Sequence, residues 1–356
     1  MQKPLKHFFE SWKDFNSLRR GFKNHPKLID FSSSDKEIFH LILIKPTKYD
    51  DDGFAIHWYR PFMLSNTLAV VYGLARDASL RKILGDNVEI RICAVDENYL
   101  AADYEILTSN LKKHNQRALV CLVGVQTNQF PRATDVALLF RQAEIPVCIG
   151  GFHVSGCISM LDDMPSELVA AQTDGISLYA GELEGGRLDQ VILDCWQGDL
   201  KPLYDFIGWV PPISQSPLPY YTDEMMENSI SKMASIDLGR GCPFECNFCC
   251  IINVQGRKSR TRLPGALETY VKDLYRRGGN SLFITDDNFS RNESWQDHLD
   301  CLIRLRSKGF KLSVVIQVDT RCHEIPGFIE KAVAAGVNTV FIGLESLNSA
   351  NLAAME

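Results

Sequence analysis

Apolar and polar positions alternate along most of the chain in a pattern that predicts strands followed by helices. Apolar runs with the length of buried strands occur at residues 39–44, 88–95, 118–125, 146–149 and 175–179. Segments with helical apolar spacing follow them at residues 61–75, 103–113, 134–143, 158–164 and 187–196. This order indicates βαβ units, a parallel sheet and right-handed crossovers. We therefore predict an α/β, doubly wound, Rossmann-like domain of about five strands over residues 37–200, after an N-terminal extension at 1–36.

The alternation resumes after a proline-rich stretch. Prolines recur between residues 202 and 219, which stiffens the chain, so residues 201–232 are predicted to be a linker. Further strands are expected at 233–238, 281–284, 312–318 and 339–343, and helices at 265–276, 294–307 and 325–335. Four such repeats predict a second parallel sheet with one layer of helices, over residues 233–356.

The composition and net charge narrow the classes of protein that fit this pattern. The chain has 356 residues, which suits about two domains, and its 45% hydrophobic and 23% charged residues are typical of a globular protein. The net charge of −6 weighs against nucleic acid as the main partner. No apolar run approaches the roughly 20 residues of a transmembrane segment, and no signal peptide is recognisable. We expect a cytoplasmic protein.

Cysteines gather directly after the first strand of the second predicted domain. Cys242, Cys246 and Cys249 have the spacing CxxxCxxC, and Gly239 and Gly241 allow a sharp turn there. Structural zinc favours two separated pairs of ligands, and a redox role favours a lone CxxC, so both remain weaker alternatives. Three thiolates on a [4Fe–4S] cluster would leave one iron open for chemistry. The spacing therefore favours an iron–sulfur cluster.

This loop resembles the signature of the radical S-adenosylmethionine (SAM) superfamily. In that family three cysteines hold a [4Fe–4S] cluster, the open iron binds SAM, and electron transfer releases a 5′-deoxyadenosyl radical. The resemblance implies the first four β/α units of a partial (β/α)6 barrel, incomplete at the C-terminal end. Functional residues of such barrels collect at the carboxyl ends of strands. The residues that match the family's SAM contacts there, or face the same rim, are Phe248, Asp286, Asp287, Gln317, Glu345 and Ser346.

Several of these residues also have simpler interpretations. Asp286 and Asp287 could cap the following helix, and Gln317 could be a solvated strand end. The basic run at 257–262 is expected to be a solvated face, with contact to an acidic substrate or a reductase as the alternative. Cys250 is expected to be incidental.

Loops at the carboxyl ends of the first domain's strands are rich in small and polar residues. Paired glycines admit close approach of a flat or phosphate-bearing ligand, and the absence of GxGxxG disfavours a nicotinamide cofactor. Placed before a radical SAM domain, this segment resembles the cobalamin-binding domain of B12-type radical SAM enzymes. The DxHxxG motif is absent, so any cobalamin would be bound without that histidine. The candidate cobalamin contacts implied by the resemblance are Thr127, Gly150, Gly151, His153, Gly181 and Glu182.

The resemblance implies a radical SAM enzyme, with cobalamin-dependent methyl transfer to an unactivated carbon of a small molecule or lipid. An electron donor such as flavodoxin or ferredoxin would be its partner. The alternatives are a B12-independent radical SAM cyclase or oxidative enzyme, and a non-catalytic cofactor-binding or sensing protein.

Overall fold

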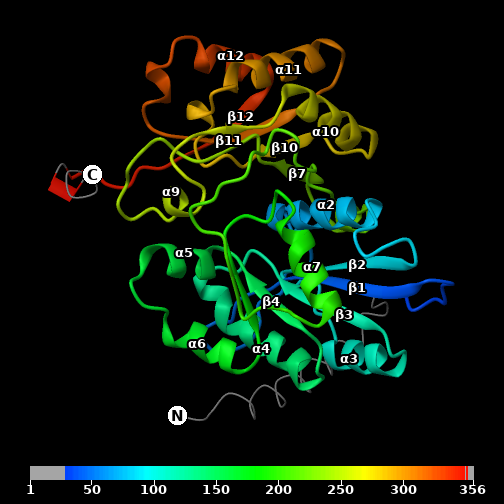
Figure 1. Cartoon of the computed structure of the whole chain (residues 1–356). Helices are drawn as coiled ribbons and strands as arrows, with labels where there is room; N and C mark the ends of the chain where they lie inside the picture. The colour runs from blue at the N-terminus through cyan, green and yellow to red at the C-terminus, as the bar shows by residue number, and fades with distance from the viewer. Residues whose placement is uncertain (1–28, 349, 352–356) are drawn as a thin grey trace.

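Two parallel sheets, one above the other in Figure 1, organise the part of the chain that the structure describes. This structure is a computed structural model, and it describes residues 29–348 and 350–351. Most of the predicted extension at 1–36 therefore lies outside the described residues. None of the helices in the described ranges has the length and apolar character that a membrane span needs.

The first sheet has six parallel strands in the order β2-β1-β3-β4-β5-β6. Its strands are β1 (Glu37–Lys45), β2 (Val88–Asp96), β3 (Arg117–Leu122), β4 (Val147–Gly150), β5 (Ser177–Ala180) and β6 (Leu203–Asp205). The strand order reverses at β1, so the topological switch point of this doubly wound sheet lies between β1 and β3. The predicted fold class is confirmed.

Helices cover both faces of this sheet because successive residues of a strand point to opposite sides. On β1, Leu41 and Leu43 belong to one apolar cluster, whereas Ile42 and Ile44 belong to another. The first face is covered by α2 (Asn66–Leu80) and α7 (Arg187–Gln197). The second is covered by α3 (Tyr104–Lys113), α4 (Phe130–Gln142), α5 (Phe152–Met160) and α6 (Ser166–Thr173), with the short 3₁₀ turn η2 (Thr127–Gln129) before α4.

Two details differ from the sequence prediction. The helix expected at 61–75 begins only after Ser65, whose hydroxyl accepts a hydrogen bond from the amide of Leu68 at 3.2 Å and caps α2. The stretch predicted as a linker from residue 201 begins with β6, which pairs with β5 as a sixth strand. Three residues beside a proline are too short to show strand periodicity, which is why the sequence suggested about five strands.

The second sheet has four parallel strands in the order β12-β11-β10-β7 and does not close into a barrel within the described residues. Its strands are β7 (Met233–Ile236), β10 (Ser281–Ile284), β11 (Ser313–Val318) and β12 (Val337–Ile342). One helical layer consists of α10 (Pro264–Arg276), α11 (Trp295–Ser307) and α12 (Phe328–Ala335). The short connecting elements are α8 (Asp223–Asn228), β8 (Gly239–Arg240), α9 (Ile251–Val254), β9 (Arg260–Thr261), η3 (Phe289–Arg291) and η4 (Cys322–Glu324).

The two sheets are joined through α2, which lies between them in Figure 1. Its buried face belongs to an apolar cluster that continues into β7 and α10. Just before α2, Met63 pairs in parallel with Met233 and adds a bridge along the outer edge of β7. The amide of Tyr220 donates to the carbonyl of Ala69 at 2.9 Å, which ties the segment after β6 to the same helix. The carboxyl ends of both sheets are thereby held close to one another.

Candidate functional site: a cavity between the two sheets

A cavity of about 380 Å³ lies between the two sheets, and residues of both line it. The first domain contributes residues at the carboxyl ends of β1, β3, β4 and β5, together with residues of α2 and α7. The second domain contributes residues that follow β7 and β10. Ligands bind at the carboxyl ends of strands and at topological switch points in such sheets. Lining residues at these strand ends include Gly124, Gly150, Gly181, Gly239, Thr285 and Asp287.

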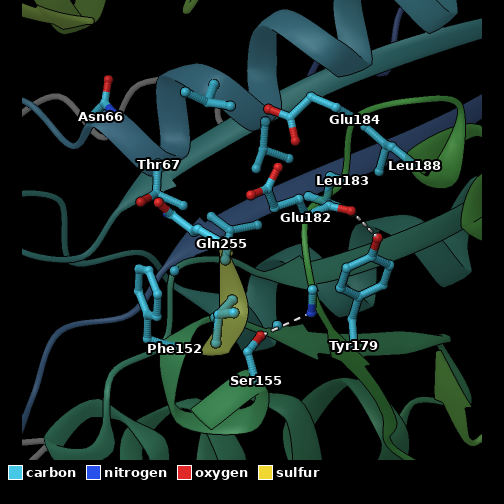
Figure 2. Close-up of a pocket in the computed structure, with 18 of the residues that line it drawn as sticks. Asn66, Thr67, Phe152, Ser155, Tyr179, Glu182, Leu183, Glu184, Leu188 and Gln255 are labelled. Atoms are coloured by element: carbon cyan, nitrogen blue, oxygen red, sulfur yellow. Dashed lines mark hydrogen bonds between the residues drawn. The ribbon is translucent and has the colours of Figure 1, made fainter. Parts of the chain in front are cut away.

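Glycines make one side of the cavity. Gly151 has φ +147°, and a Cβ there would lie 2.1 Å from the backbone nitrogen of Val125. This close approach is needed because the amide of Val125 donates to the carbonyl of Gly150 at 3.1 Å, and the amide of His153 donates to the carbonyl of Val125 at 3.0 Å. Gly181 has φ +108°, and its amide donates to the hydroxyl of Ser155 at 3.0 Å (Figure 2). The result is a wall of exposed backbone that a flat ligand can approach.

The deeper part of the cavity is apolar. Buried Val70 and Val71 of α2 face Leu188 and Val191 of α7, both on the same side of the first sheet. Tyr179 also lines this part, and its hydroxyl donates to the backbone carbonyl of Glu182 at 2.7 Å (Figure 2). The cavity can therefore hold a ligand with one apolar end and one polar end.

The predicted cobalamin contacts divide into two groups. Gly150, Gly151, Gly181 and Glu182 line the cavity, whereas Thr127 and His153 are not among its lining residues. Buried His153 packs on the ring of Phe130, at 4.4 Å between centroids, and its Nδ1 lies 3.3 Å from the hydroxyl of Thr127. Burial lowers the pKa of His153. No histidine is among the described residues that line the cavity.

The polar end of the cavity carries ion pairs between the domains. Glu182 accepts hydrogen bonds from both terminal nitrogens of Arg260, at 2.6 and 2.8 Å, and from Arg240 at 3.2 Å. Arg240 also lies 2.6 Å from a carboxylate oxygen of Glu184 and donates to Asp237 at 2.8 Å. Arg262 lies 3.4 Å from a carboxylate oxygen of Asp237. We call the six residues that make these contacts the interdomain ion cluster: Glu182, Glu184, Asp237, Arg240, Arg260 and Arg262.

The three predicted cluster cysteines lie between β8 and β9, on a loop whose base Gly241 helps to form with φ +92°. The amide of Cys242 donates to the carbonyl of Gly256 at 3.3 Å, and that of Cys249 donates to the carbonyl of Cys246 at 3.1 Å. Burial raises the pKa of the Cys242 thiol, and the nearby charges of Cys249 and Cys246 add to this rise. Cys246 and Cys249 therefore both lie within electrostatic reach of Cys242.

In the described part of the chain, no three His, Cys, Asp or Glu side chains converge on the position of a single metal ion. A [4Fe–4S] cluster makes a different demand, because each thiolate binds a different iron and the sulfurs need not converge on one point. Three partly exposed thiols on a short loop, two of which contribute to the raised pKa of Cys242, fit that demand.

The two predicted SAM-binding aspartates have different environments. Asp286 is buried and accepts hydrogen bonds from the amide of Leu238 at 2.6 Å and from the side chain of Asn292 at 2.7 Å, so it supports the turn after β7. Burial raises its pKa to about 7. Asp287 lines the cavity, where desolvation raises its pKa to about 6 against the opposing effect of Arg240. Only Asp287 of this pair is placed to meet a ligand.

The other predicted SAM contacts lie outside the cavity lining. Gln317 donates to the backbone carbonyl of Asp286 at 3.2 Å. Ser346 accepts from the amide of Asn348 at 3.0 Å, and Glu345 and Phe248 are exposed. The structure thus places Asp287 in the cavity lining and leaves Phe248, Gln317, Glu345 and Ser346 outside that lining.

Sequence reasoning missed the role of the arginines. The run at 257–262 was expected to be a solvated face, but Arg260 and Arg262 are largely buried in the interdomain ion cluster, with side chains 14% and 1% exposed. The available signal was the charge complementarity between this run and the acidic residues at 182 and 184. Asn66, whose side chain donates to the hydroxyl of Thr285 at 3.2 Å across the cavity, carried no signal in the sequence.

Comparison with known proteins agrees with this architecture. Residues 236–356 match the family model described as "Radical SAM superfamily". The chain is 26% identical over 267 residues to a hopanoid C-2 methylase of Rhodopseudomonas palustris (strain TIE-1), covering 73% of this chain and 46% of the relative. It is 29% identical over 250 residues to a bacteriochlorophyllide d C-8(2)-methyltransferase of Chlorobaculum tepidum, covering 65% of this chain and 51% of the relative. The chain thus spans about half the length of these curated relatives.

A solved structure shares the fold. The radical SAM methyltransferase TsrM of Kitasatospora setae, solved with cobalamin and a [4Fe–4S] cluster bound, superimposes with a TM-score of 0.61 at 14% identity. The alignment covers 88% of this chain and 62% of TsrM. SAM and a [4Fe–4S] cluster are the cofactors of the superfamily whose model matches residues 236–356. Residues 236–356 therefore match the radical SAM superfamily, and the chain shares its fold with TsrM.

Proposed function

We propose that the protein is a radical SAM methyltransferase that binds cobalamin in the cavity between its sheets and methylates an unactivated carbon of a small molecule or lipid. The observation that carries the proposal is the cavity itself, because glycines of the first sheet and Asp287 of the second line the same space. One cofactor held by each domain would therefore face a shared volume. Both relatives, a hopanoid C-2 methylase and a bacteriochlorophyllide d C-8(2)-methyltransferase, are named for methylation at a carbon position, which supports this reaction class.

The cobalamin part of the proposal has its own support. Gly150, Gly151 and Gly181 present backbone where a flat macrocycle would lie, and Val71 and Leu188 offer an apolar recess for its tail. The cavity contains no histidine among its described lining residues, so we propose binding without a histidine ligand to cobalt. When bound, the two cofactors would supply methyl-group transfer and one-electron cleavage of SAM.

The residues of this chain would bind and orient. We propose that Cys242, Cys246 and Cys249 hold the [4Fe–4S] cluster and that Asp287 contacts SAM at the cavity. A carboxyl group with a pKa of about 6 is mostly ionised at neutral pH, so Asp287 would accept a hydrogen bond from the amino group of SAM. An electron donor such as flavodoxin or ferredoxin would approach the exposed side of the cysteine loop, where Phe248 is 49% exposed.

The test is anaerobic reconstitution of the full chain with iron, sulfide and hydroxocobalamin, followed by absorption spectra and product analysis under reduction with SAM. The proposal expects cluster and cobalamin bands in the purified protein, and both S-adenosylhomocysteine and 5′-deoxyadenosine as products. A cluster band without cobalamin, with 5′-deoxyadenosine alone, would instead identify a B12-independent radical SAM enzyme. A protein that binds cluster and SAM but forms neither product would be a non-catalytic binding protein.

A further inference from the structure

The interdomain ion cluster connects the wall of the cavity to the base of the cysteine loop. Glu182 and Glu184 follow β5 and line the cavity, whereas Arg240 and Arg260 face each other as paired residues of the β8–β9 ribbon. That ribbon closes the loop that contains Cys242, Cys246 and Cys249. Glu182 lies 58 positions from Arg240 and 78 positions from Arg260 in sequence, so these contacts, rather than chain connectivity, bring the two regions together.

The cluster is balanced in charge and largely buried. It contains three carboxylates and three guanidinium groups, and the exposed fraction of the six side chains ranges from 1% to 14%. A buried ion pair is weak evidence for stability, because desolvation of both charges offsets their attraction. Its better-attested benefit is a defined geometry, since a misplaced partner leaves a buried charge without compensation. The cluster is therefore better suited to fixing an arrangement than to adding stability.

The individual contacts are directional. Arg260 approaches Glu182 with two nitrogens, one to each carboxylate oxygen, at 2.6 and 2.8 Å. Such bidentate pairs fix orientation as well as distance. Arg240 makes separate contacts to Glu182, Glu184 and Asp237, so its side chain is held from both domains. Arg240 lies two residues before Cys242.

We propose that Glu182 and Glu184 are positioning residues that set the distance and orientation of the cysteine loop relative to the cavity. They act through Arg240 and Arg260, which flank the base of the cysteine loop. The inference rests on the proposed function only in taking the cavity as the cobalamin site and the loop as the cluster site. It adds a role in alignment to the sequence-based expectation of Glu182 as a cofactor contact.

The first test uses the full chain without cofactors, so it does not depend on the proposed function. In Glu182→Gln, amide hydrogen exchange of residues 239–242 and 260–262 should become at least tenfold faster. Arg260→Lys keeps the positive charge but loses the two-point contact, and it should show a smaller increase at the same amides. The matched control is Glu97→Gln, which removes a buried carboxylate paired with Arg132 at 2.6 Å in the first domain. It should leave exchange of the ribbon amides unchanged.

The second test uses the reconstituted protein and measures the distance between the reduced cluster and cob(II)alamin by pulsed electron paramagnetic resonance. Glu182→Gln should broaden the distance distribution and lower the ratio of S-adenosylhomocysteine to 5′-deoxyadenosine, while iron content stays at the wild-type level. Unchanged ribbon exchange together with an unchanged distance distribution would overturn the inference. Failure of the wild-type chain to bind cobalamin would count against the proposed function alone, because the exchange experiment would still decide the role of Glu182.

Discussion

The substitution Gly151→Ala tests why the position directly after β4 needs a glycine, because the expected loss of unfolding free energy can be worked out from the structure. Gly151 has φ +147° and ψ −174°, a region that is nearly restricted to glycine, and holding alanine there costs about 1–3 kcal/mol. The new Cβ would also lie 2.1 Å from the nitrogen and 2.5 Å from the oxygen of Val125, both backbone atoms that cannot rotate away. Forcing this overlap adds about 1–3 kcal/mol. The total expected loss of unfolding free energy is about 4 kcal/mol.

Urea denaturation followed by far-ultraviolet circular dichroism measures this loss. With an m value of about 3 kcal/mol per molar, the midpoint should fall by about 1.3 M. Gly53→Ala is the matched control, because Gly53 has φ +87° but no atom within 4 Å of its Cβ position. That variant should lose only the conformational contribution of about 1–2 kcal/mol. If the two variants were equally destabilised within about 0.5 kcal/mol, the steric part of the reasoning would be refuted.

Three further predictions concern the cysteine loop and two partly buried ionisable groups. Cys246→Ala should reduce reconstituted iron to background while Cys250→Ala retains the wild-type content, and equal iron in both variants would contradict the ligand assignment. Burial lowers the pKa of Lys45 to about 8, so the folded chain releases this proton between pH 8 and 10.5 while the unfolded chain keeps it. The free energy of unfolding of the wild-type chain, relative to that of Lys45→Met, should therefore rise by about 3 kcal/mol over that pH range. Equilibrium unfolding measures this difference, and a difference that does not change with pH would disprove the expectation. Burial alone would raise the pKa of Asp319, but hydrogen bonds led by that from Arg291 at 2.7 Å hold it at about 2. Asp319→Asn should cost about 1 kcal/mol at pH 7 after allowance for solvent screening, and denaturation curves should show this difference disappearing as the pH falls through 2.

The strands and helices that could be predicted from the sequence are those whose apolar residues recur with a regular local period. The apolar run of β1 and the helical spacing of α7 each depend on which face of an element is buried, and neighbouring residues carry that information. The spacing of Cys242, Cys246 and Cys249 is also local, so the loop could be recognised without a structure. Elements of only three residues, such as β6, are too short to show such a pattern.

The contacts between domains could not be predicted in this way. Glu182 meets Arg260 only because the segment after β6 returns along α2 and places the second sheet over the first. Before that docking is known, a buried arginine in a basic run looks the same as a solvated one. The same limit applied to Asp286, whose position after a strand resembled a ligand site, although its partners are the amide of Leu238 and the side chain of Asn292.

The bridge between Met63 and Met233 has a consequence for how this architecture can be divided or recombined. Because Met63 belongs to the first domain, the outer edge of β7 is covered by a residue that a separated second domain would lack. The apolar cluster that runs from α2 into β7 and α10 would be cut by the same separation. An open strand edge beside exposed apolar surface favours self-association. We therefore expect the two domains to be exchanged between proteins as a unit, and a fragment that begins at β7 to aggregate when produced alone.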